Sequence, residues 1–476
     1  MNRISLRVPC RLLEVVVAVA LAGCAVGPDY VRPSAPVPAA YKEAPLAAGA
    51  TWLPAAPADT LARGPWWQLF GDDDLNRLAV RADASNQTVA RSVASYRQAQ
   101  ALGREARAAL FPTLGVSASA RRSGARGSVP TNALGLSLDG DWQPDLWGRL
   151  GRGVESAAAN AQASAADLAA ARLSAQGELA SDYFSLREAD AEGALLASTA
   201  EGYERALQIT QNRYAAGIVA KTDVLQAQTQ LANARADIAA LRQTRERFEH
   251  AIAVLVGVAP GDFSLPEAAW RQILPSVPLG LPSELLQRRP DIASNERAVA
   301  AANARVGIEQ AAYFPSLTLS GSLGSAGSRV SQLFGASGLL WSLGVAAAQT
   351  VFDAGARNAR VAAAEAARDV AVASYRQNVL TAFQSVEDQL SATRSLAEQS
   401  ALRQQASDAA DLTEQQILNR YRAGQVSYSD VVTAQASALA ARRALVQVAV
   451  NRQLAAVLLI QALGGGWSTS APPPPP

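Results

Sequence analysis

Apolar residues recur along this chain with two different periods, which predict long helices and short strands. From residue 221 to about 256, apolar positions alternate in spacings of three and four, the pattern of a coiled-coil helix. The stripe consists of Val224, Ala227, Leu231, Ala234, Ile238, Leu241, Phe248, Ile252 and Leu255. The same stripe returns from Val431, and Arg245 and Arg452 break the two copies at matching places. The pattern predicts paired, packed helices, with both arginines at solvated or channel-facing kinks.

The stripe belongs to an internal repeat that covers most of the chain. Phe111-Pro112 returns as Phe314-Pro315, Asp145 with Arg149 returns as Asp353 with Arg357, and Asn212-Arg213-Tyr214 returns as Asn419-Arg420-Tyr421. Each copy predicts a helix, two short strands, a very long helix, a sharp turn and a second long helix. The first very long helix, from residue 148 to about 214, would measure roughly 100 Å at the rise of an α-helix. Gly217 and Gly424 fall at the turns, where the backbone geometry favours glycine.

The segments about 112–122, 132–143, 315–323 and 338–352 have a period of two. One face carries Leu, Val, Ala and Trp, and the other carries Ser, Gly, Thr and Asp. This alternation is typical of transmembrane β-strands, which face lipid on one side and water on the other. Soluble β-hairpins with one buried face would show the same pattern, and that alternative stays open here.

The number of strands indicates an assembly of several chains. Four strands cannot close a membrane barrel, because the smallest has about eight and an open edge cannot face lipid. Two chains would supply eight strands around a filled interior, and three would supply twelve around a lumen. Because the inward residues are small or polar, we expect a trimer. The predicted fold class is mainly α with a small transmembrane β-barrel contribution, in which two tandem repeats per chain build a twelve-stranded barrel and an α-helical periplasmic tunnel.

The N-terminus has the features of a lipoprotein signal peptide over residues 1–23. Arginines at positions 3, 7 and 11 precede an apolar run, Val15 to Ala22, that is too short to span a bilayer. The run ends in Leu21-Ala22-Gly23-Cys24, which resembles the bacterial lipobox. We therefore expect N-acyl and S-diacylglycerol lipid on Cys24, and Ala25 favours the outer membrane. The alternative is an ordinary signal peptide with an incidental cysteine.

The composition argues against most catalytic and metal chemistry. The chain of 476 residues has one His, one Met and two Cys, and both cysteines precede residue 25. No disulfide framework is therefore expected in the body of the protein. A net charge of +2 gives no electrostatic reason to expect nucleic-acid binding. Neither a nucleophile–base pair nor metal-ligand spacing is recognisable, and His250 beside the apolar stripe is expected to be structural or exposed. We therefore expect no enzyme, cofactor or metal site.

Several motifs resemble those of TolC/NodT-type outer-membrane efflux lipoproteins, over essentially the whole mature chain. They are Gly27-Pro28-Asp29-Tyr30 after Cys24, Trp66-Trp67, Asp145-Leu146-Trp147-Gly148-Arg149, the stretch from Gly280 to Ile292 with Arg289-Pro290-Asp291-Ile292, and Ala311-Ala312-Tyr313-Phe314-Pro315. The predicted organisation of the mature chain is an extended arm (24–65), a first repeat (66–257), an equatorial linker (258–289), a second repeat (290–465) and a disordered tail (466–476).

The resemblance implies a gated, passive outer-membrane duct that exports small molecules. A periplasmic adaptor and an inner-membrane pump, often of the resistance-nodulation-division class, would be its partners, and its periplasmic tip would be closed at rest. Family gates combine a tyrosine and basic residues near the turn with acidic rings on the return helix. The matching residues here are Asp430, Tyr421, Arg420 and Arg422, with Asp223, Tyr214 and Arg213 as counterparts.

One position departs from the family pattern. Thr433 stands where many relatives have a second acid, so a doubled acidic ring is not expected. Asp430 also suits the start of the return helix as a capping residue. Three other functions remain open: a type I secretion exit duct of the same fold, a periplasmic adaptor lipoprotein, and a structural lipoprotein that links membrane to cell wall. The substrates do not follow from the sequence.

Overall fold

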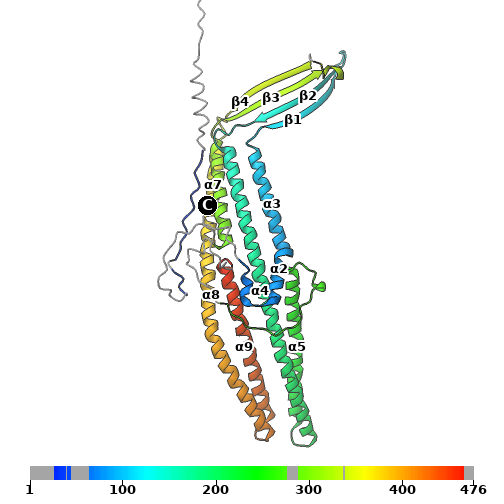
Figure 1. Cartoon of the computed structure of the whole chain (residues 1–476), viewed down its shortest axis with the longest axis vertical. Helices are drawn as coiled ribbons and strands as arrows, with labels where there is room; N and C mark the ends of the chain where they lie inside the picture. The colour runs from blue at the N-terminus through cyan, green and yellow to red at the C-terminus, as the bar shows by residue number, and fades with distance from the viewer. Residues whose placement is uncertain (1–25, 39, 44–63, 276–287, 336–337, 466–476) are drawn as a thin grey trace, which may run out of the picture. The chain divides into compact units, whose positions relative to one another are not determined.

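The computed structural model describes residues 26–38, 40–43, 64–275, 288–335 and 338–465 (Figure 1). The elements of the first repeat are η1 (Trp66–Phe70), α2 (Asp73–Ser85), α3 (Gln87–Ala108), β1 (Thr113–Ser123), β2 (Thr131–Trp142), α4 (Arg149–Ala215) and α5 (Lys221–Leu255). After η2 (Pro260–Asp262), the second repeat has α7 (Pro290–Ala311), β3 (Ser316–Gly327), η3 (Val330–Gln332), β4 (Leu339–Ala348), α8 (Ala356–Arg422) and α9 (Tyr428–Ala462). The predicted order of helices and strands is confirmed. The signal peptide, Cys24 and the tail at 466–476 lie outside the described residues.

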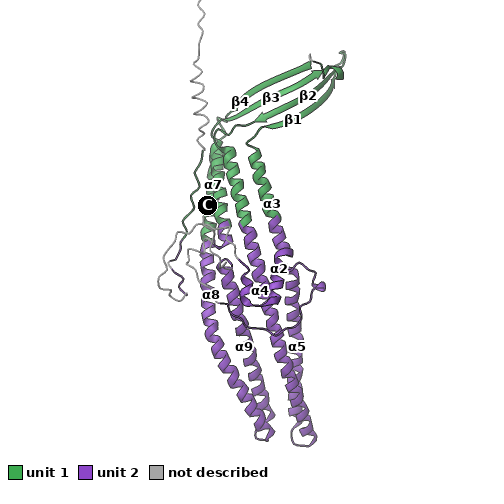
Figure 2. Cartoon of the chain, in the orientation of Figure 1, with its two compact units in different colours: residues 1–35, 94–165, 294–377 green, residues 36–93, 166–293, 378–476 purple. Residues whose placement is uncertain are grey.

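The chain divides into two compact units, each built from three separate segments. The first unit contains residues 1–35, 94–165 and 294–377, and the second contains residues 36–93, 166–293 and 378–476 (Figure 2). The four strands belong to the first unit, and both helical turns belong to the second.

The sheet of the first unit is fully antiparallel in the order β1-β2-β3-β4. Thr113 pairs with Asp141 at the end of the sheet where the strands join the helices, and Ser123 pairs with Thr131 at the end that carries the β1–β2 and β3–β4 loops. We call these the helix end and the loop end. Strand β3 links the two repeats, because Leu138 of β2 pairs with Leu323 of β3. The register places all the predicted apolar positions on one face.

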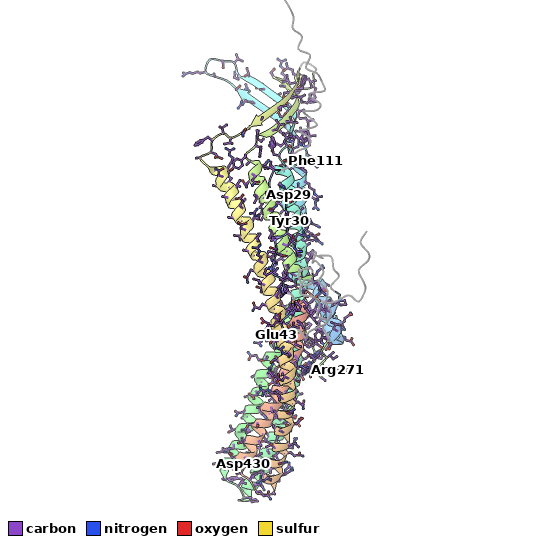
Figure 3. The ribbon with its side chains drawn as sticks, turned by 90° about the vertical axis from the view of Figure 1, so that its left-hand side faces the viewer. Asp29, Tyr30, Glu43, Phe111, Arg271 and Asp430 are labelled. Atoms are coloured by element: carbon purple, nitrogen blue, oxygen red, sulfur yellow. The ribbon has the colours of Figure 1, made fainter. Side chains whose placement is uncertain are left out.

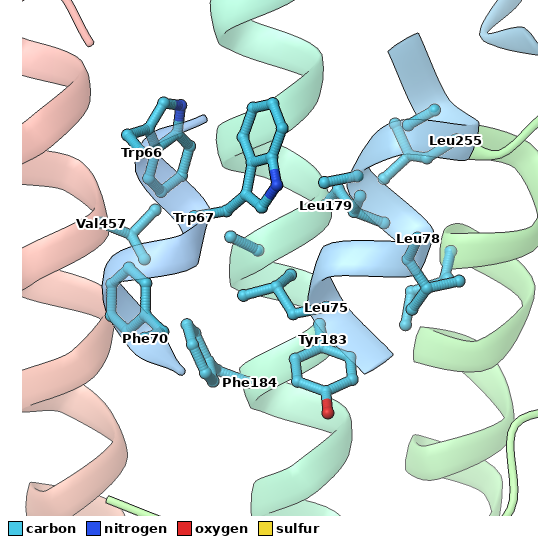
Figure 4. Packing of buried hydrophobic residues seen from close by; sticks show 14 of the residues in the cluster. Trp66, Trp67, Phe70, Leu75, Leu78, Leu179, Tyr183, Phe184, Leu255 and Val457 are labelled. Carbon is cyan, nitrogen blue, oxygen red and sulfur yellow. The ribbon is translucent and has the colours of Figure 1, made fainter. Parts of the chain in front are cut away.

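The main core of the second unit packs η1 and α2 against α4, α5 and α9 (Figure 4). Its largest side chains are aromatic: Trp66, Trp67, Phe70, Tyr183 and Phe184. The Phe70 and Phe184 rings lie 5.0 Å apart at an angle of 52°. Each fully buried side chain of this size contributes roughly 1.5–3 kcal/mol. The Trp-Trp segment therefore anchors the start of the first repeat onto the long helices.

Helices α4 and α8 have 67 residues each, and α5 and α9 have 35 each, so the helices of the two hairpins have equal lengths. Both long helices end in the same way. Gly217 and Gly424 adopt left-handed φ angles of 73° and 75°. Their N–H groups donate to the carbonyls of Tyr214 and Tyr421 at 2.9 Å. This hydrogen bonding closes the helix and reverses the chain, as expected for glycine at a helix C-terminus.

Helix α9 alone, among the helices described, is long and apolar enough to cross a membrane by length and composition. Half of its most apolar window is buried inside the protein. Val457 and Ile460 belong to the aromatic core described above. The apolar character of α9 is therefore that of a helix that packs in the core.

Candidate functional site

One face of the sheet is apolar and exposed. Leu114 and Val116 of β1 are each 75% exposed, and Leu343 of β4 is 81% exposed. On the opposite face, the Ser117 and Ser137 hydroxyl oxygens lie 2.7 Å apart, and Ser137 donates to Asp139 Oδ2 at 2.7 Å. A large exposed apolar patch marks a lipid or protein interface. The sheet has one face suited to lipid and one suited to water.

Both lateral edges of this sheet are open. In the described part of the chain, β1 pairs only with β2, and β4 pairs only with β3. The two edge strands carry ten or more residues each, so each leaves a row of backbone donors and acceptors without partners. Such an edge is unstable in lipid, because every backbone polar group there must be hydrogen bonded. The sheet is a fragment of a closed barrel.

The N-terminal arm docks at the helix end of the sheet. Val26 N–H donates to the carbonyl of Trp147 at 3.1 Å, and the Trp147 ring stacks on Phe314 with centroids 4.9 Å apart. Gly27 approaches α7 so closely that a Cβ would lie 2.4 Å from Gly307 Cα. Cys24 lies outside the described residues, and its lipidation stays a prediction. Cys24 precedes Val26 by two residues, and two residues of extended chain span at most about 7 Å.

A salt bridge fixes the same arm to the first unit. Arg152, whose side chain is 8% exposed, lies 3.0 Å from Asp29 and 2.8 Å from Glu155. Asn303 Nδ2 donates to the carbonyl of Pro28 at 2.8 Å, and Tyr30 hydroxyl donates to Glu296 (Figure 3). The Gly-Pro-Asp-Tyr segment is a docking element, and it holds the chain next to Cys24 at the base of the membrane sheet.

At the other end of the long helices, three of the proposed gate residues meet between the two hairpins. Arg213 of α4 donates to the carbonyl oxygens of Tyr421 and Arg422, at 3.3 Å and 3.4 Å. Its guanidinium carbon also lies 4.7 Å from the centre of the Tyr421 ring. Tyr421 is buried against Tyr428 and Val431. We call this contact between α4 and the α8–α9 turn the hairpin latch.

The other proposed gate residues have different surroundings. Tyr214 is 45% exposed, and Arg420 is exposed. Asp223 is half-buried in the first turn of α5. The Arg422 side chain is exposed, and only its carbonyl takes part in the latch. The structure therefore groups Arg213 with Tyr421 rather than all seven residues together.

Asp430 completes a capping box at the start of α9 (Figure 3). Its Oδ2 accepts hydrogen bonds from Ser427 N–H at 2.9 Å and from Ser427 Oγ at 2.7 Å. These hydrogen bonds hold the pKa of Asp430 below its ordinary value. The carboxylate is exposed and ionised, so it both caps the helix and carries a charge at the turn.

The family comparison decides among the functions that this architecture allows. A model of the outer membrane efflux protein family matches residues 78–258 and 281–465. The chain belongs to this family. It is an outer-membrane channel component of an efflux system. Its helix–strand–strand–hairpin repeats are those of the family's channel fold.

Relatives match this outer membrane efflux protein over nearly its whole length. It is 30% identical to the Escherichia coli K12 cation efflux system protein CusC over 461 residues, which cover 96% of this chain and 99% of that protein. It is 31% identical to the outer membrane protein OprJ of Pseudomonas aeruginosa over 462 residues, 94% of each chain. The solved outer-membrane channel OprN superimposes with a TM-score of 0.83 at 32% identity, covering 93% of this chain and 100% of that one.

The second unit contains a buried ionic network that the sequence pattern did not predict, and the predicted solvated or channel-facing position of Arg245 is wrong. Arg245 is not solvated: its side chain is 14% exposed and lies 2.7 Å from Asp190. Arg187 lies 2.8 Å from the other oxygen of Asp190 and donates to the carbonyl of Pro266 at 2.9 Å. Arg245 donates to the carbonyl of Leu265 at 2.6 Å. The network fastens the linker to α4 and α5, and the break in the apolar stripe was its one signal.

Burial changes the charge of α4 near this network. The pKa of Glu188 is raised to about 7, first by burial and second by the negative charge of Glu192. The pKa of Asp182 is raised to about 6, first by burial and second by the negative charge of Glu178. These carboxylates are therefore less ionised at neutral pH than their composition implies. Among the described residues, no group of three or more His, Cys, Asp or Glu side chains has the geometry of a metal site.

Proposed function

We propose that three copies of this chain form a passive, gated duct across the outer membrane. The open-edged amphipathic sheet is the observation that carries this proposal. Three sheets of four strands supply a twelve-stranded barrel with Ser117, Ser137 and Asp139 facing a wet lumen. Two helical hairpins per chain then supply six similar hairpins for a tunnel.

A periplasmic adaptor and an inner-membrane pump of the resistance-nodulation-division class complete the system in this proposal. The relatives support it, because several are named as outer membrane proteins of efflux pumps. Their names include cation, antibiotic and toluene efflux, so we assign no single substrate class. The duct needs no cofactor and catalyses no reaction. Acyl chains on Cys24 anchor the arm beside the barrel.

Detergent-extracted protein tests the assembly. We expect a particle with the mass of three chains that conducts ions in a planar bilayer. The Cys24→Ser variant should keep its trimeric mass, because the barrel itself holds the protein in detergent. A monomeric, water-soluble Cys24→Ser protein with its strands buried would contradict the proposal.

Loss of the hairpin latch is expected to open the tip. Arg213→Ala removes a cation–π contact and two hydrogen bonds to carbonyls, together roughly 1–2 kcal/mol. An energy of this size shifts a two-state equilibrium by about 5–30-fold, so mean single-channel conductance should rise. Arg205→Ala on the same helix is the matched control, because the one ion pair of Arg205 among the described residues is exposed and 3.8 Å long. Equal conductance for Arg213→Ala and Arg205→Ala would exclude the latch as part of the gate.

The charge and the capping role of Asp430 can be separated with two variants. Asp430→Asn removes the charge but keeps an oxygen that can accept from Ser427 N–H, whereas Ser427→Ala weakens the cap and keeps the charge. If Asp430 lines the constriction, Asp430→Asn raises conductance and lowers cation selectivity in bilayer recordings, and Ser427→Ala leaves selectivity unchanged. Selectivity that falls only with Ser427→Ala would assign Asp430 to capping alone.

A further inference from the structure

Charges are segregated along the membrane sheet. Within the two strand hairpins, residues 113–142 and 316–348, the only acidic residues are Asp139 and Asp141. They pair with Gly115 and Thr113 at the helix end. Arginines occur only at the loop end: Arg121, Arg122, Arg126 and Arg329. All four arginines are exposed, and none forms an ion pair among the residues that the structure describes. The loop end is therefore purely cationic.

The strand register separates two of these arginines onto opposite faces of the sheet. Arg122 pairs with Asn132 and follows Ala118 and Ala120, which continue the apolar face. Arg121 follows Ser117 and Ser119 on the polar face, because side chains alternate along a strand. Arg122 thus lies one pleat, about 7 Å, beyond the last apolar residue of β1. This distance matches the headgroup layer, which adds about 5–7 Å outside the hydrocarbon on each side of a bilayer.

The two ends of the sheet lie at different surfaces of the outer membrane. The helix end connects to α3, α4, α7 and α8, and it carries the docked arm beside Cys24. In an outer-membrane channel with periplasmic helices, the loop end is the outer surface. The outer leaflet there contains glycolipids that bear phosphate groups. A guanidinium binds phosphate with two parallel hydrogen bonds and does not lose its charge.

We propose that Arg122, on the apolar face at the loop end, binds a phosphate group of an outer-leaflet glycolipid whose acyl chains cover that face. Below Arg122 the apolar face continues through Ala120, Ala118 and Val116 of β1, which pair with Leu134, Leu136 and Leu138 of β2. This face accepts acyl chains while Arg122 holds the phosphate above them. This inference rests on the proposed function in one respect, namely the apolar face lying against lipid.

Native mass spectrometry of the full-length trimer tests this site, with bisphosphorylated lipid A as the ligand and its dephosphorylated form for comparison. One arginine at an anionic lipid surface contributes about fivefold in binding. R122Q should therefore lower the affinity for bisphosphorylated lipid A about fivefold and leave the affinity for the dephosphorylated form unchanged. R121Q is the matched control, because it removes the same charge from the neighbouring residue on the polar face, and it should leave both affinities unchanged.

Equal losses for R121Q and R122Q, or no preference of the wild type for the phosphorylated lipid, would overturn the proposal. Displacement of the bound lipid by inorganic phosphate alone would also overturn it, since the acyl chains would then contribute nothing. R122K keeps the charge without the paired donors, so its affinity for bisphosphorylated lipid A should lie between those of the wild type and R122Q. A loss of affinity in R122K tests the site even if R122Q assembles poorly. Bilayer conductance of the same samples tests the duct separately, because R122Q should conduct like the wild type.

Discussion

Replacing Arg187 with alanine is expected to lower the free energy of unfolding of the second unit by about 3–5 kcal/mol, the usual effect of breaking a buried ion pair. Arg187 and Asp190 are each 3% exposed and lie 2.8 Å apart. Arg187 also lies 3.2 Å from Asp74 and donates to the carbonyl of Pro266. Its removal takes one partner from each of these three acceptors. Because Arg245 still pairs with Asp190, the loss should fall toward the lower end of the range.

Urea unfolding followed by tryptophan fluorescence measures this loss, since Trp66 and Trp67 lie in the core of the same unit. Arg205→Ala is again the control, because Arg205 and its partner Glu201 are 72% and 71% exposed and such pairs contribute little. Its unfolding midpoint should stay within error of the wild type. Matching midpoints for Arg187→Ala and the wild type would show that the network does not stabilise the unit.

The architecture could be predicted because it follows from local periods. The seam of α5, from Val224 to Leu255, reads as a helix because apolar residues return to one face every seven positions. The apolar and polar faces of the strands could be predicted in the same way, because Leu134, Leu136 and Leu138 alternate with small or polar residues. The glycine turns were predictable from Gly217 and Gly424, because few other residues adopt a left-handed φ at a helix end.

Contacts between distant segments could not be predicted in the same way. Arg245 interrupts an apolar seam, and that interruption does not reveal whether water or Asp190 receives the charge. The docking of Gly27 against Gly307 joins segments far apart in the chain, and no periodic pattern encodes that contact. The gate shows the same limit, because the family resemblance named Arg213 and Tyr421 separately, and only the fold brings them into contact.

Replacing Gly257 with alanine is expected to destabilise the second unit by about 2–4 kcal/mol, from left-handed strain and from overpacking. Gly257 ends α5 with a φ of 71°, and its N–H donates to the carbonyl of Val254 at 3.1 Å. A Cβ there would lie 2.3 Å from the carbonyl oxygen of Ser85, at the junction of α2 and α3. That oxygen belongs to rigid backbone, because the neighbouring Asn86 side chain donates to the carbonyl of Leu255 at 2.9 Å. The strain cannot be relieved by rotating a side chain.

Gly217→Ala separates the two contributions, because Gly217 ends α4 with nearly the same φ, 73°, and no described atom lies within 4 Å of an added Cβ. It should show only the backbone strain, about 1–2 kcal/mol. In urea unfolding, Gly257→Ala should therefore lose clearly more stability than Gly217→Ala. Equal losses would mean that α5 can shift away from Ser85. The core that holds Trp66 and Trp67 against the long helices would then be looser than the packing around Asn86 indicates.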